Sequence, residues 1–250
     1  MMNVLVLMSG SSQSFQEAGY TYPKNLVEIA GKPMMQRVME PLMALGKFGA
    51  RHVCIVRKEE SRKFYTAMSL QLMWPSIQVV EIPSSTTGAA CSALLGVDHI
   101  DNQDPLVICN GDQILDAVDL VEVVHGFQNR NLDAGVIVFD DIHPRWSFVR
   151  CSPDGLVVEA AEKRPISRLA TAGFYYFARG FDFVRASMEM IKKDAQVNGM
   201  FFICPSFNEM ILAQAKIGVH RIERKQYRSL SNPSDVAAYE HFLGTGSNSR

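Results

Sequence analysis

The sequence predicts an α/β fold in which helices flank a mostly parallel sheet, with a small additional β layer. In the first 140 residues, short apolar runs typical of buried strands alternate with segments of helical period. Such alternation indicates strand–helix–strand units, and therefore parallel strands covered by helices on both faces. After residue 140 the strands follow one another with only turns between them, which indicates hairpins.

The first half of the chain carries the alternating pattern. Its continuous apolar runs predict buried strands over residues 3–8, 52–56, 77–82, 105–110 and 134–139. Amphipathic segments between these runs predict helices over residues 34–45, 59–72, 88–97 and 120–129.

The second half begins with three closely spaced strands, and Pro153-Asp154-Gly155 predicts a hairpin turn between the first two. The strands are predicted over residues 147–152, 155–162 and 170–178. The remaining predicted elements are helices over 180–192 and 205–215, a strand over 217–223, and a last helix that begins at Asn232-Pro233. Asparagine as N-cap followed by proline at the first helical position is a typical helix start.

These elements are expected to form a single domain over residues 1–243, with residues 1–140 and 141–243 as its two halves. The chain has no repeat, no low-complexity segment and no linker rich in proline, glycine or serine. Residues 244–250, with the sequence GTGSNSR, are predicted to be a disordered tail.

The charge balance argues against a polyanionic partner. The chain has 25 basic and 26 acidic residues and a formal net charge of −1, so neither nucleic acid nor a membrane surface is expected as a partner. An anionic substrate would have to be held by a few local groups. The five cysteines are scattered without a C-x-x-C pair, and no apolar run approaches the ~18 residues of a membrane span. We therefore expect a soluble, cytoplasmic protein with free thiols.

Ligands of open α/β sheets bind outside the carboxyl ends of the strands, so the loops after the strands are candidate sites. The loop after the first strand, "MSGSSQSFQEAGYTYPK", is rich in glycine and serine and ends at Lys24. Its backbone N–H groups could approach phosphate oxygens, although it contains neither common phosphate-loop motif, and an ordinary surface loop is the alternative. Asp112 follows Gly111 in "CNGDQ", where a carboxylate could ligate Mg²⁺ or simply form a turn.

Two further segments carry candidate groups. Gly88 is predicted at a helix N-terminus, where free N–H groups favour an anion or a base edge. A plain helix start capped by Thr86 or Thr87 is the alternative there. In "EAAEKRP", Glu162 and Lys163 are adjacent on a strand and point to opposite faces, so at most one of them is expected to face a cleft.

The order and spacing of these segments resemble the sugar-phosphate nucleotidyltransferases, a pyrophosphorylase-like family. The opening pattern of that family, A-G-x-G-[ST]-R followed by P-K-P-L and G-K-P, corresponds to "MSGSSQSF", "PKNL" and "AGKPMMQRV", with Asn25 in place of the second proline. Its G-D turn, its E-K-P and its glycine-centred strand correspond to "NGDQ", "EKRP" and "ATAGFYYF". Segments such as "HPRWSFV" and "NGMFFICPSFNEMI" are most similar to short bacterial members encoded with capsule or surface-polysaccharide genes.

The resemblance implies a Rossmann-like, GT-A-like nucleotidyltransferase fold, with a nucleotide-binding first half and an acceptor-binding second half. It implies an enzyme that joins a nucleoside triphosphate to a phosphorylated small molecule, such as a sugar 1-phosphate, and releases pyrophosphate. The acceptor phosphate would attack the α-phosphorus in line, with Mg²⁺ as cofactor. The product would serve surface-polysaccharide synthesis, and the apolar C-terminal half would suit a homodimer contact.

The resemblance also implies roles for individual residues. Lys24 and Asp112 are the implied catalytic residues, and Asp112 is the implied Mg²⁺ ligand. The implied nucleotide-binding residues are Met8, Ser9, Gly10, Ser11, Thr87, Gly88, Asn110 and Gly111. The implied acceptor-binding residues are Ser147, Phe148, Glu162, Lys163, Gly173 and Asn198.

The chain departs from the family pattern at charged positions. Ser14 stands where the family has an arginine that clamps the triphosphate, and Ser229 stands where many members have a second acidic metal ligand. A serine hydroxyl does not replace a bidentate arginine. Arg37, Arg57, Lys32 or a residue of a partner chain could supply the charge in a divergent enzyme. The alternatives are a non-catalytic module that binds a nucleotide or nucleotide-sugar, and a glycosyltransferase that uses a nucleotide-sugar.

Overall fold

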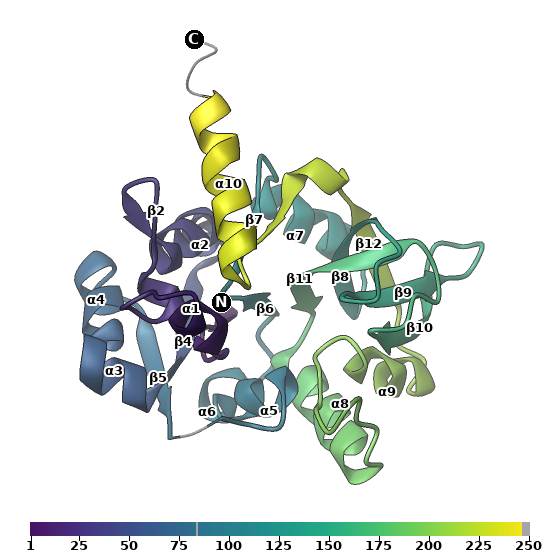
Figure 1. Ribbon diagram of the computed structural model, residues 1–250. Helices are drawn as coiled ribbons and strands as arrows, with labels where there is room; N and C mark the ends of the chain where they lie inside the picture. The colour runs from purple at the N-terminus through teal and green to yellow at the C-terminus, as the bar shows by residue number, and fades with distance from the viewer. Residues whose placement is uncertain (84, 247–250) are drawn as a thin grey trace.

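The computed structural model describes residues 1–83 and 85–246, and its centre is one sheet with helices on both faces (Figure 1). Four parallel strands lie side by side in the order β6 (Leu106–Asn110), β1 (Met2–Leu7), β4 (Ala50–Arg57) and β5 (Gln78–Ile82). Parallel neighbours need crossover connections, which the helices of the first half provide. The structure confirms the predicted α/β architecture.

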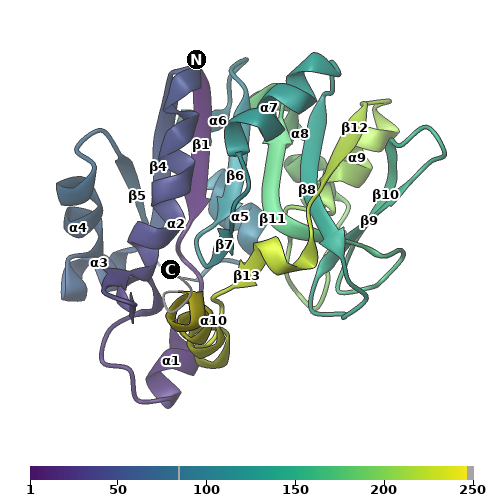
Figure 2. The ribbon, with the colours of Figure 1, turned by 90° about the horizontal axis from the view of Figure 1, so that it is seen from above.

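The second half of the chain extends the same sheet. β11 (Leu169–Phe177) is antiparallel to β6 and pairs on its other side with β8 (Ala134–Asp140) and β9 (Ser147–Cys151). β9 is antiparallel to β10 (Val157–Glu162), and β12 (Ile217–Arg221) is parallel to β8. β9 meets β11 at a single residue pair, so the β9–β10 hairpin is joined to the rest of the main sheet by a short contact (Figure 2). Within the described residues, the small additional sheets are two separate two-stranded pairs.

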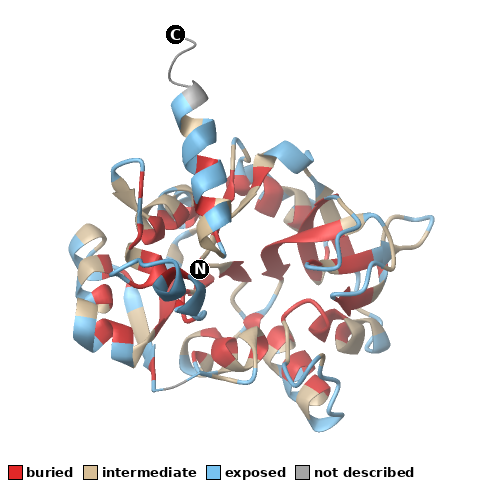
Figure 3. Cartoon of the chain, viewed as in Figure 1, coloured by how far each residue is buried: buried red, intermediate tan, exposed pale blue. Residues whose placement is uncertain are grey.

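Alternate residues of the strands face two apolar cores. In β1, Val4 and Val6 belong to one core and Leu5 to the other, as the two-residue period of a strand requires. One core is closed by α2 (Met34–Leu42) and α7 (Leu120–Asn129), and the other by α5 (Ala89–Leu94), α8 (Gly180–Lys192) and α9 (Ser206–Leu212). The central strands are therefore buried, while the covering helices have one exposed face (Figure 3).

Three predicted helices are shorter than expected. The helix predicted over 59–72 is two helices, α3 (Lys58–Phe64) and α4 (Thr66–Met73), because Tyr65 adopts a left-handed conformation between them. The helix predicted over 88–97 ends at Leu94, and α6 (Val97–Ile100) begins after Gly96. The helix predicted over 34–45 changes after Leu42 into a 3-10 segment (Met43–Phe48) that Gly49 ends with φ = 65°.

Short elements carry no periodic pattern, and the sequence did not indicate them. They are α1 (Gln13–Glu17), a 3-10 turn at Lys24–Leu26, the pair β2 (Glu28–Ile29) and β3 (Lys32–Pro33), a 3-10 turn at Arg224–Gln226, and the pair β7 (Gln113–Leu115) and β13 (Tyr227–Ser229). The β7–β13 pair matters most, because it brings the end of the chain next to Asp112.

The last helix, α10 (Pro233–Gly246), begins where the sequence predicted. Asn232 Oδ1 accepts a hydrogen bond from the Asp235 N–H (2.9 Å), as an N-cap does. The helix continues through Gly244, which corrects the predicted start of a disordered tail, because Leu243 still packs against the core. Residues 247–250 of that predicted tail lie outside the described residues. Within the part of the chain that the structure describes, no helix has the length and apolar character needed to cross a membrane.

Candidate active site

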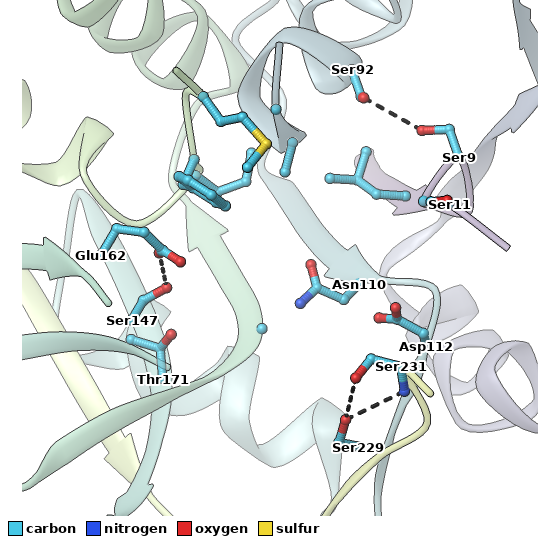
Figure 4. A pocket seen from close by; sticks show the side chains of 18 of the residues that line it. Ser9, Ser11, Ser92, Asn110, Asp112, Ser147, Glu162, Thr171, Ser229 and Ser231 are labelled. Carbon is cyan, nitrogen blue, oxygen red and sulfur yellow. Dashed lines mark hydrogen bonds between the residues drawn. The ribbon is translucent and has the colours of Figure 1, made fainter. Parts of the chain in front are cut away.

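A cavity of about 530 Å³ lies at the carboxyl ends of the parallel strands. The ends of β1, β4 and β6 form one side of it, and residues of β9, β10 and β11 form the other. Figure 4 shows Asn110 and Asp112 near its centre, with Ser9 and Ser11 on one side. Glu162 and its neighbours lie across the cavity from them. This is where open α/β sheets bind ligands.

Buried side chains fix the loop after β1. Ser12 Oγ accepts a hydrogen bond from the Lys24 backbone N–H (3.0 Å) and donates one to Glu60 Oε1 (2.8 Å). Asn25 Nδ2 donates to the Met8 carbonyl oxygen (2.7 Å), so the residue that departs from the family pattern has a structural role here. The loop residues that face the cavity are Ser9, Gly10 and Ser11.

Lys24 and Asp112 form an ion pair inside the cavity, with 2.8 Å between Nζ and Oδ2. The Lys24 side chain is 6% exposed and that of Asp112 is 25% exposed. A buried ammonium group needs such a partner, because desolvation without one is costly. Gly10 leaves room for the ammonium group, since a Cβ at Gly10 would lie 2.7 Å from Lys24 Nζ.

A bulge in β11 gives the middle of the cavity its shape. The register of β11 against β8 shifts between Thr171 and Tyr175, and Gly173 lies between them with φ = 61°. A Cβ at Gly173 would lie 2.4 Å from Asn110 Nδ2 and 2.2 Å from Gln113 Oε1. Only glycine fits this conformation and this space, which explains the glycine at the centre of the strand.

The far end of the cavity combines one carboxylate with an apolar wall. Glu162 accepts a hydrogen bond from Ser147 Oγ, and burial raises the pKa of the Glu162 carboxyl. Thr171 and Tyr175 line the cavity beside them, and the Tyr175 hydroxyl is hydrogen-bonded to Thr171 Oγ1 (3.0 Å). The apolar wall consists of Trp146, Met200, Phe202 and Ile203. Such a pocket suits a small molecule with hydroxyl groups and an apolar face.

The structure brings together ten of the residues that the sequence singled out. These line the cavity: Ser9, Gly10, Ser11, Lys24, Gly88, Asn110, Asp112, Ser147, Glu162 and Gly173. Six others lie outside its lining: Met8, Thr87, Gly111, Phe148, Lys163 and Asn198.

The six residues outside the lining have other surroundings. Met8 and Phe148 belong to the apolar core, and Gly111 packs against Leu7 and Met8, where a Cβ would be 2.7 Å from the Leu7 carbonyl oxygen. The N–H of Phe201 donates to the carbonyl oxygen of Thr87 (2.7 Å). Asn198 lies in a turn with φ = 53°. The exposed Lys163 also has φ = 53°, and its Nζ lies 5.2 Å from the centre of the Phe202 ring.

Of the described residues, three with cationic side chains line the cavity: Lys24, Arg57 and Arg145. Ser14, at the position of the family's arginine, is exposed on α1 and is not part of the lining. Arg57 donates from Nε to the Ser9 carbonyl oxygen (2.9 Å), so its guanidinium lies beside the first-strand loop. The other two proposed substitutes are engaged elsewhere. Arg37 donates to the Ile29 carbonyl oxygen, and Lys32 pairs with Glu40.

Several lining residues escaped the sequence analysis, chief among them Arg145, Ser92 and Ser231. Arg145 precedes Trp146 in the segment "HPRWSFV", which drew attention for its aromatic residues. Its role depends on contacts with Ser229 and Asp235, about 90 residues away, which no local pattern reveals.

The chemistry of the donors limits which metal ions the cavity could hold. Among the described residues, no group of three histidine, cysteine, aspartate or glutamate side chains is placed to hold a metal ion. Asp112 and Glu162 are the carboxylates of the described lining, and Asp112 has the Asn110 side chain beside it, across the cavity from Glu162 (Figure 4). One carboxylate suits Mg²⁺, which commonly binds through one or two carboxylates, substrate phosphates and water.

A sequence model of the MobA-like NTP transferase domain matches residues 4–172, about two thirds of the chain. The chain belongs to this family. The match begins in β1 and ends within β11, so it includes Lys24, Asp112 and Glu162.

Two proteins are similar to this chain over 70% of its length, and one of them is a uridylyltransferase by name. The UTP–glucose-1-phosphate uridylyltransferase AglF of Haloferax volcanii is 28% identical over 182 residues, covering 70% of this chain and 72% of AglF. The bifunctional protein GlmU of Methanocaldococcus jannaschii is 23% identical over 184 residues. That alignment covers 70% of this chain but only 40% of GlmU.

A solved structure has the same fold as this chain. The nucleoside-diphosphate-sugar pyrophosphorylase from Vibrio cholerae RC9 superposes with a TM-score of 0.84 at 24% identity. The superposition covers 95% of this chain and 99% of that one. The nucleotidyltransferase fold that the sequence resemblance implied is therefore confirmed, and so is the family.

Proposed function

We propose that this protein is an enzyme that transfers a nucleotidyl group from a nucleoside triphosphate to a phosphorylated small molecule, with release of pyrophosphate. The observation that carries the proposal is the Lys24–Asp112 ion pair at the centre of the cavity. On one side of the pair lies a loop of small residues, and on the other lies a pocket with a single buried carboxylate, Glu162. Two substrates that react with each other need such a two-sided cavity.

The reaction follows from this arrangement. An oxygen of the acceptor phosphate attacks the α-phosphorus of the nucleotide, the bond to the bridging β-phosphate oxygen breaks, and pyrophosphate leaves. The backbone of Ser9 and Gly10 holds the nucleotide, with Gly88 near the base. Lys24 places its ammonium group where negative charge develops on the transferred group, which lowers the barrier by electrostatic stabilisation.

Asp112 is the proposed ligand of Mg²⁺. When bound, Mg²⁺ neutralises phosphate charge and orients the phosphates. The carboxylate that would hold it is the one that Lys24 contacts, so Lys24 and the ion would share one anionic group. The substrate phosphates complete both sets of contacts.

The acceptor is proposed to be a sugar 1-phosphate or a similar compound. Glu162 and Ser147 can hydrogen-bond hydroxyl groups of such a molecule, and the wall around Trp146 can cover its apolar face. The name of AglF, a UTP–glucose-1-phosphate uridylyltransferase, supports this class of substrate. We propose a cytoplasmic role in making precursors of surface polysaccharides.

One observation favours a second candidate, a non-catalytic module that binds a nucleotide or nucleotide-sugar. The position of the family's triphosphate-clamping arginine is Ser14, which lies outside the cavity. A module of this kind would bind the nucleotide without turning it over.

Thermal denaturation with five triphosphates (CTP, UTP, GTP, ATP and dTTP) and Mg²⁺ tests the proposal first. A ligand at ~100 times its Kd stabilises a fold by ~2.7 kcal/mol. The nucleotide that binds is then assayed with glucose 1-phosphate and other phosphomonoesters for pyrophosphate release. Binding without pyrophosphate indicates the module, and release of a nucleoside diphosphate from a nucleotide-sugar indicates a glycosyltransferase.

Substitution of the central pair tests the roles of its two residues. Lys24→Met and Asp112→Asn are each expected to lower kcat by about 10²–10³-fold, the usual effect of losing one electrostatic contact to the transition state. Lys32→Met is the matched control, because Lys32 pairs with Glu40 outside the cavity. Turnover at the wild-type rate in both Lys24→Met and Asp112→Asn would refute the assignments.

A further inference from the structure

Arg145 is a cavity cation to which the mechanism above gives no task. It lies between β8 and β9, and its guanidinium packs 4.3 Å from the centre of the Trp146 ring. Nη2 donates to Asp235 Oδ2 (2.8 Å), Ser229 Oγ (3.1 Å) and Ser231 Oγ (3.4 Å). The aromatic ring on one face and three oxygens at one nitrogen hold the guanidinium in one orientation.

The rest of the guanidinium is available to a ligand. Its Nε and Nη1 make no hydrogen bond within residues 1–83 and 85–246, whereas all three contacts above use Nη2. Asp235 does not belong to the cavity lining, and it also accepts hydrogen bonds from Ser229, Ser231 and Asn232. Arg145 therefore faces the cavity, and Asp235 lies behind Arg145.

Arg145 is also placed between the two halves of the proposed reaction. The segment that it contacts, Ser229 to Ser231, is tied to the central pair, because the Leu230 N–H donates to the Asp112 carbonyl oxygen (2.8 Å). Two residues after Arg145, Ser147 donates to Glu162 in the pocket at the far end. An acceptor held at Glu162 would have to place its phosphate between these groups in order to reach the α-phosphorus at Lys24.

We infer that Arg145 binds the phosphate group of the acceptor, and that Asp235 is the positioning residue that orients its guanidinium. The inference rests on the proposed function and adds to it the group that selects phosphorylated acceptors. The neighbouring candidate, Lys163, is exposed, with its ammonium group against Phe202 and outside the cavity lining. The guanidinium keeps its positive charge in a fixed orientation, and the N–H groups of Nε and Nη1 remain available to donate hydrogen bonds to phosphate oxygens.

Phosphate binding by variants of the full-length protein tests the inference. The probes are glucose 1-phosphate and inorganic phosphate, followed by thermal denaturation, with glucose as the uncharged control. We expect Arg145→Met to raise the apparent Kd for both phosphate probes by about 10- to 100-fold, the range for losing hydrogen bonds to a charged group. Arg145→Lys should retain part of the affinity because it keeps the charge. In both Arg145 variants, the affinity for the preferred nucleoside triphosphate, UTP for example, should be unchanged.

Two further variants separate phosphate binding from general disruption. Arg168→Met is the matched control, because Arg168 is also paired with an aspartate, Asp140, but lies outside the cavity. It should bind every probe as the wild type does. Asp235→Asn should weaken phosphate binding less than Arg145→Met does, and it should leave triphosphate binding unchanged. If Asp235 only supported the fold, its substitution would weaken the binding of both ligands.

Two outcomes would overturn the inference. One is phosphate affinity in Arg145→Met equal to that of the wild type, and the other is the absence of any phosphate-dependent stabilisation of the wild-type protein. Failure of the proposed function has a different signature, because it would appear as loss of triphosphate binding or turnover in the wild type itself.

Discussion

At the scale of single residues, the cavity depends on the missing side chain of a glycine as well as on charged groups. Gly10 has no Cβ, and the ammonium group of Lys24 occupies the space that a Cβ would take. The ion pair with Asp112 forms because this space is free. A small residue in the loop after β1 thus positions a side chain from another part of the chain.

Gly10→Ala is expected to lower kcat by about 10²-fold with little loss of stability. The new Cβ would displace Lys24 Nζ, which is the flexible end of a side chain, and would separate it from Asp112. Gly126→Ala is the control: no atom lies within 4 Å of a Cβ there, and alanine in helix α7 should stabilise the fold by up to ~1 kcal/mol. Steady-state kinetics and urea denaturation measure both effects. Unchanged kcat in Gly10→Ala would contradict this reading of the loop.

Glu162→Gln is expected to stabilise the protein at pH 7 by about 1 kcal/mol, because the amide avoids the cost of ionising a buried carboxyl group. Burial raises the pKa of Glu162 above its ordinary 4.5, so the folded state binds this proton more readily than the unfolded state does. Ionisation therefore costs stability above the folded pKa, and the cost disappears as the pH falls towards 4.5. The advantage of the variant should shrink over the same range.

Urea denaturation between pH 4 and pH 8 measures this difference in the free energy of unfolding. Glu159→Gln serves as the control, because Glu159 pairs with Arg150 and Arg164 at the surface and its loss should give no such gain. A Glu162→Gln variant that is less stable than the wild type at pH 7 would show that the Ser147 contact outweighs the cost of burial.

Some residues that the sequence assigned to the loops after first-half strands line the cavity, whereas Met8 and Gly111 do not. Lys24, Asp112 and Gly88 stand in short motifs whose order along the chain is informative, and all three line the cavity. Arg145 and Ser231 carry no local signal, because tertiary contacts alone bring them to the cavity. Lys163 matches a family motif, yet its side chain lies outside the lining because its backbone turns sharply at φ = 53°.

At the scale of secondary structure, the bulge in β11 has the largest consequences. It shifts the register of the strand against β8 at the point where the strand passes the cavity, and Gly173 allows the backbone to approach Asn110 and Gln113. The strand thereby serves both as the neighbour of β6 in the sheet and as a wall of the site.

Gly173→Ala is expected to destabilise the protein by about 2–5 kcal/mol. Alanine in a left-handed conformation costs ~1–2 kcal/mol, and overlap in a packed site adds ~1–3 kcal/mol. Gly155→Ala isolates the first contribution, because Gly155 has φ = 78° with no atom within 4 Å of a Cβ, and it should cost only about 1 kcal/mol. Chemical denaturation measures the free energy of unfolding of both variants. An equal loss of stability in the two would show that Asn110 and Gln113 move aside at no cost in free energy.

Strand positions were predicted more accurately than helix ends. A continuous apolar run such as residues 105–110 is sufficient to indicate a buried strand, and β6 occupies it. The interruptions at Tyr65 and Gly96 could not be predicted, because amphipathic spacing continues across both. Two-residue strands such as β2 and β3 have no period at all.

At the scale of the whole molecule, α10 connects the two halves. Its Asp235 binds Arg145 from the second half, and Glu240 Oε1 accepts a hydrogen bond from the Ala30 N–H of the first half (3.4 Å). Figures 1 and 2 both place α10 next to α1. The family match ends at residue 172, so this connection lies outside the part of the chain that the family model describes.

Removal of residues 233–250 is expected to lower the free energy of unfolding by more than about 3 kcal/mol. Val236 and Tyr239 are buried, and each large apolar side chain contributes ~1.5–3 kcal/mol on burial. Asp235→Ala is the comparison, since it removes the charge but keeps these side chains and should cost much less. If the truncated protein unfolds at the same urea concentration as Asp235→Ala, the packing of α10 contributes nothing measurable.

The pairing of β11 with β6 also has a consequence for synthesis of the chain. β6 is complete at residue 110, but its second neighbour begins roughly 60 residues later. At ~5–20 residues per second, a ribosome needs roughly 3–12 s to supply it. During that interval the apolar edge of β6 is unpaired, which is the state in which strands join those of other chains. The translation speed between β6 and β11 therefore determines how long each nascent molecule is exposed to aggregation.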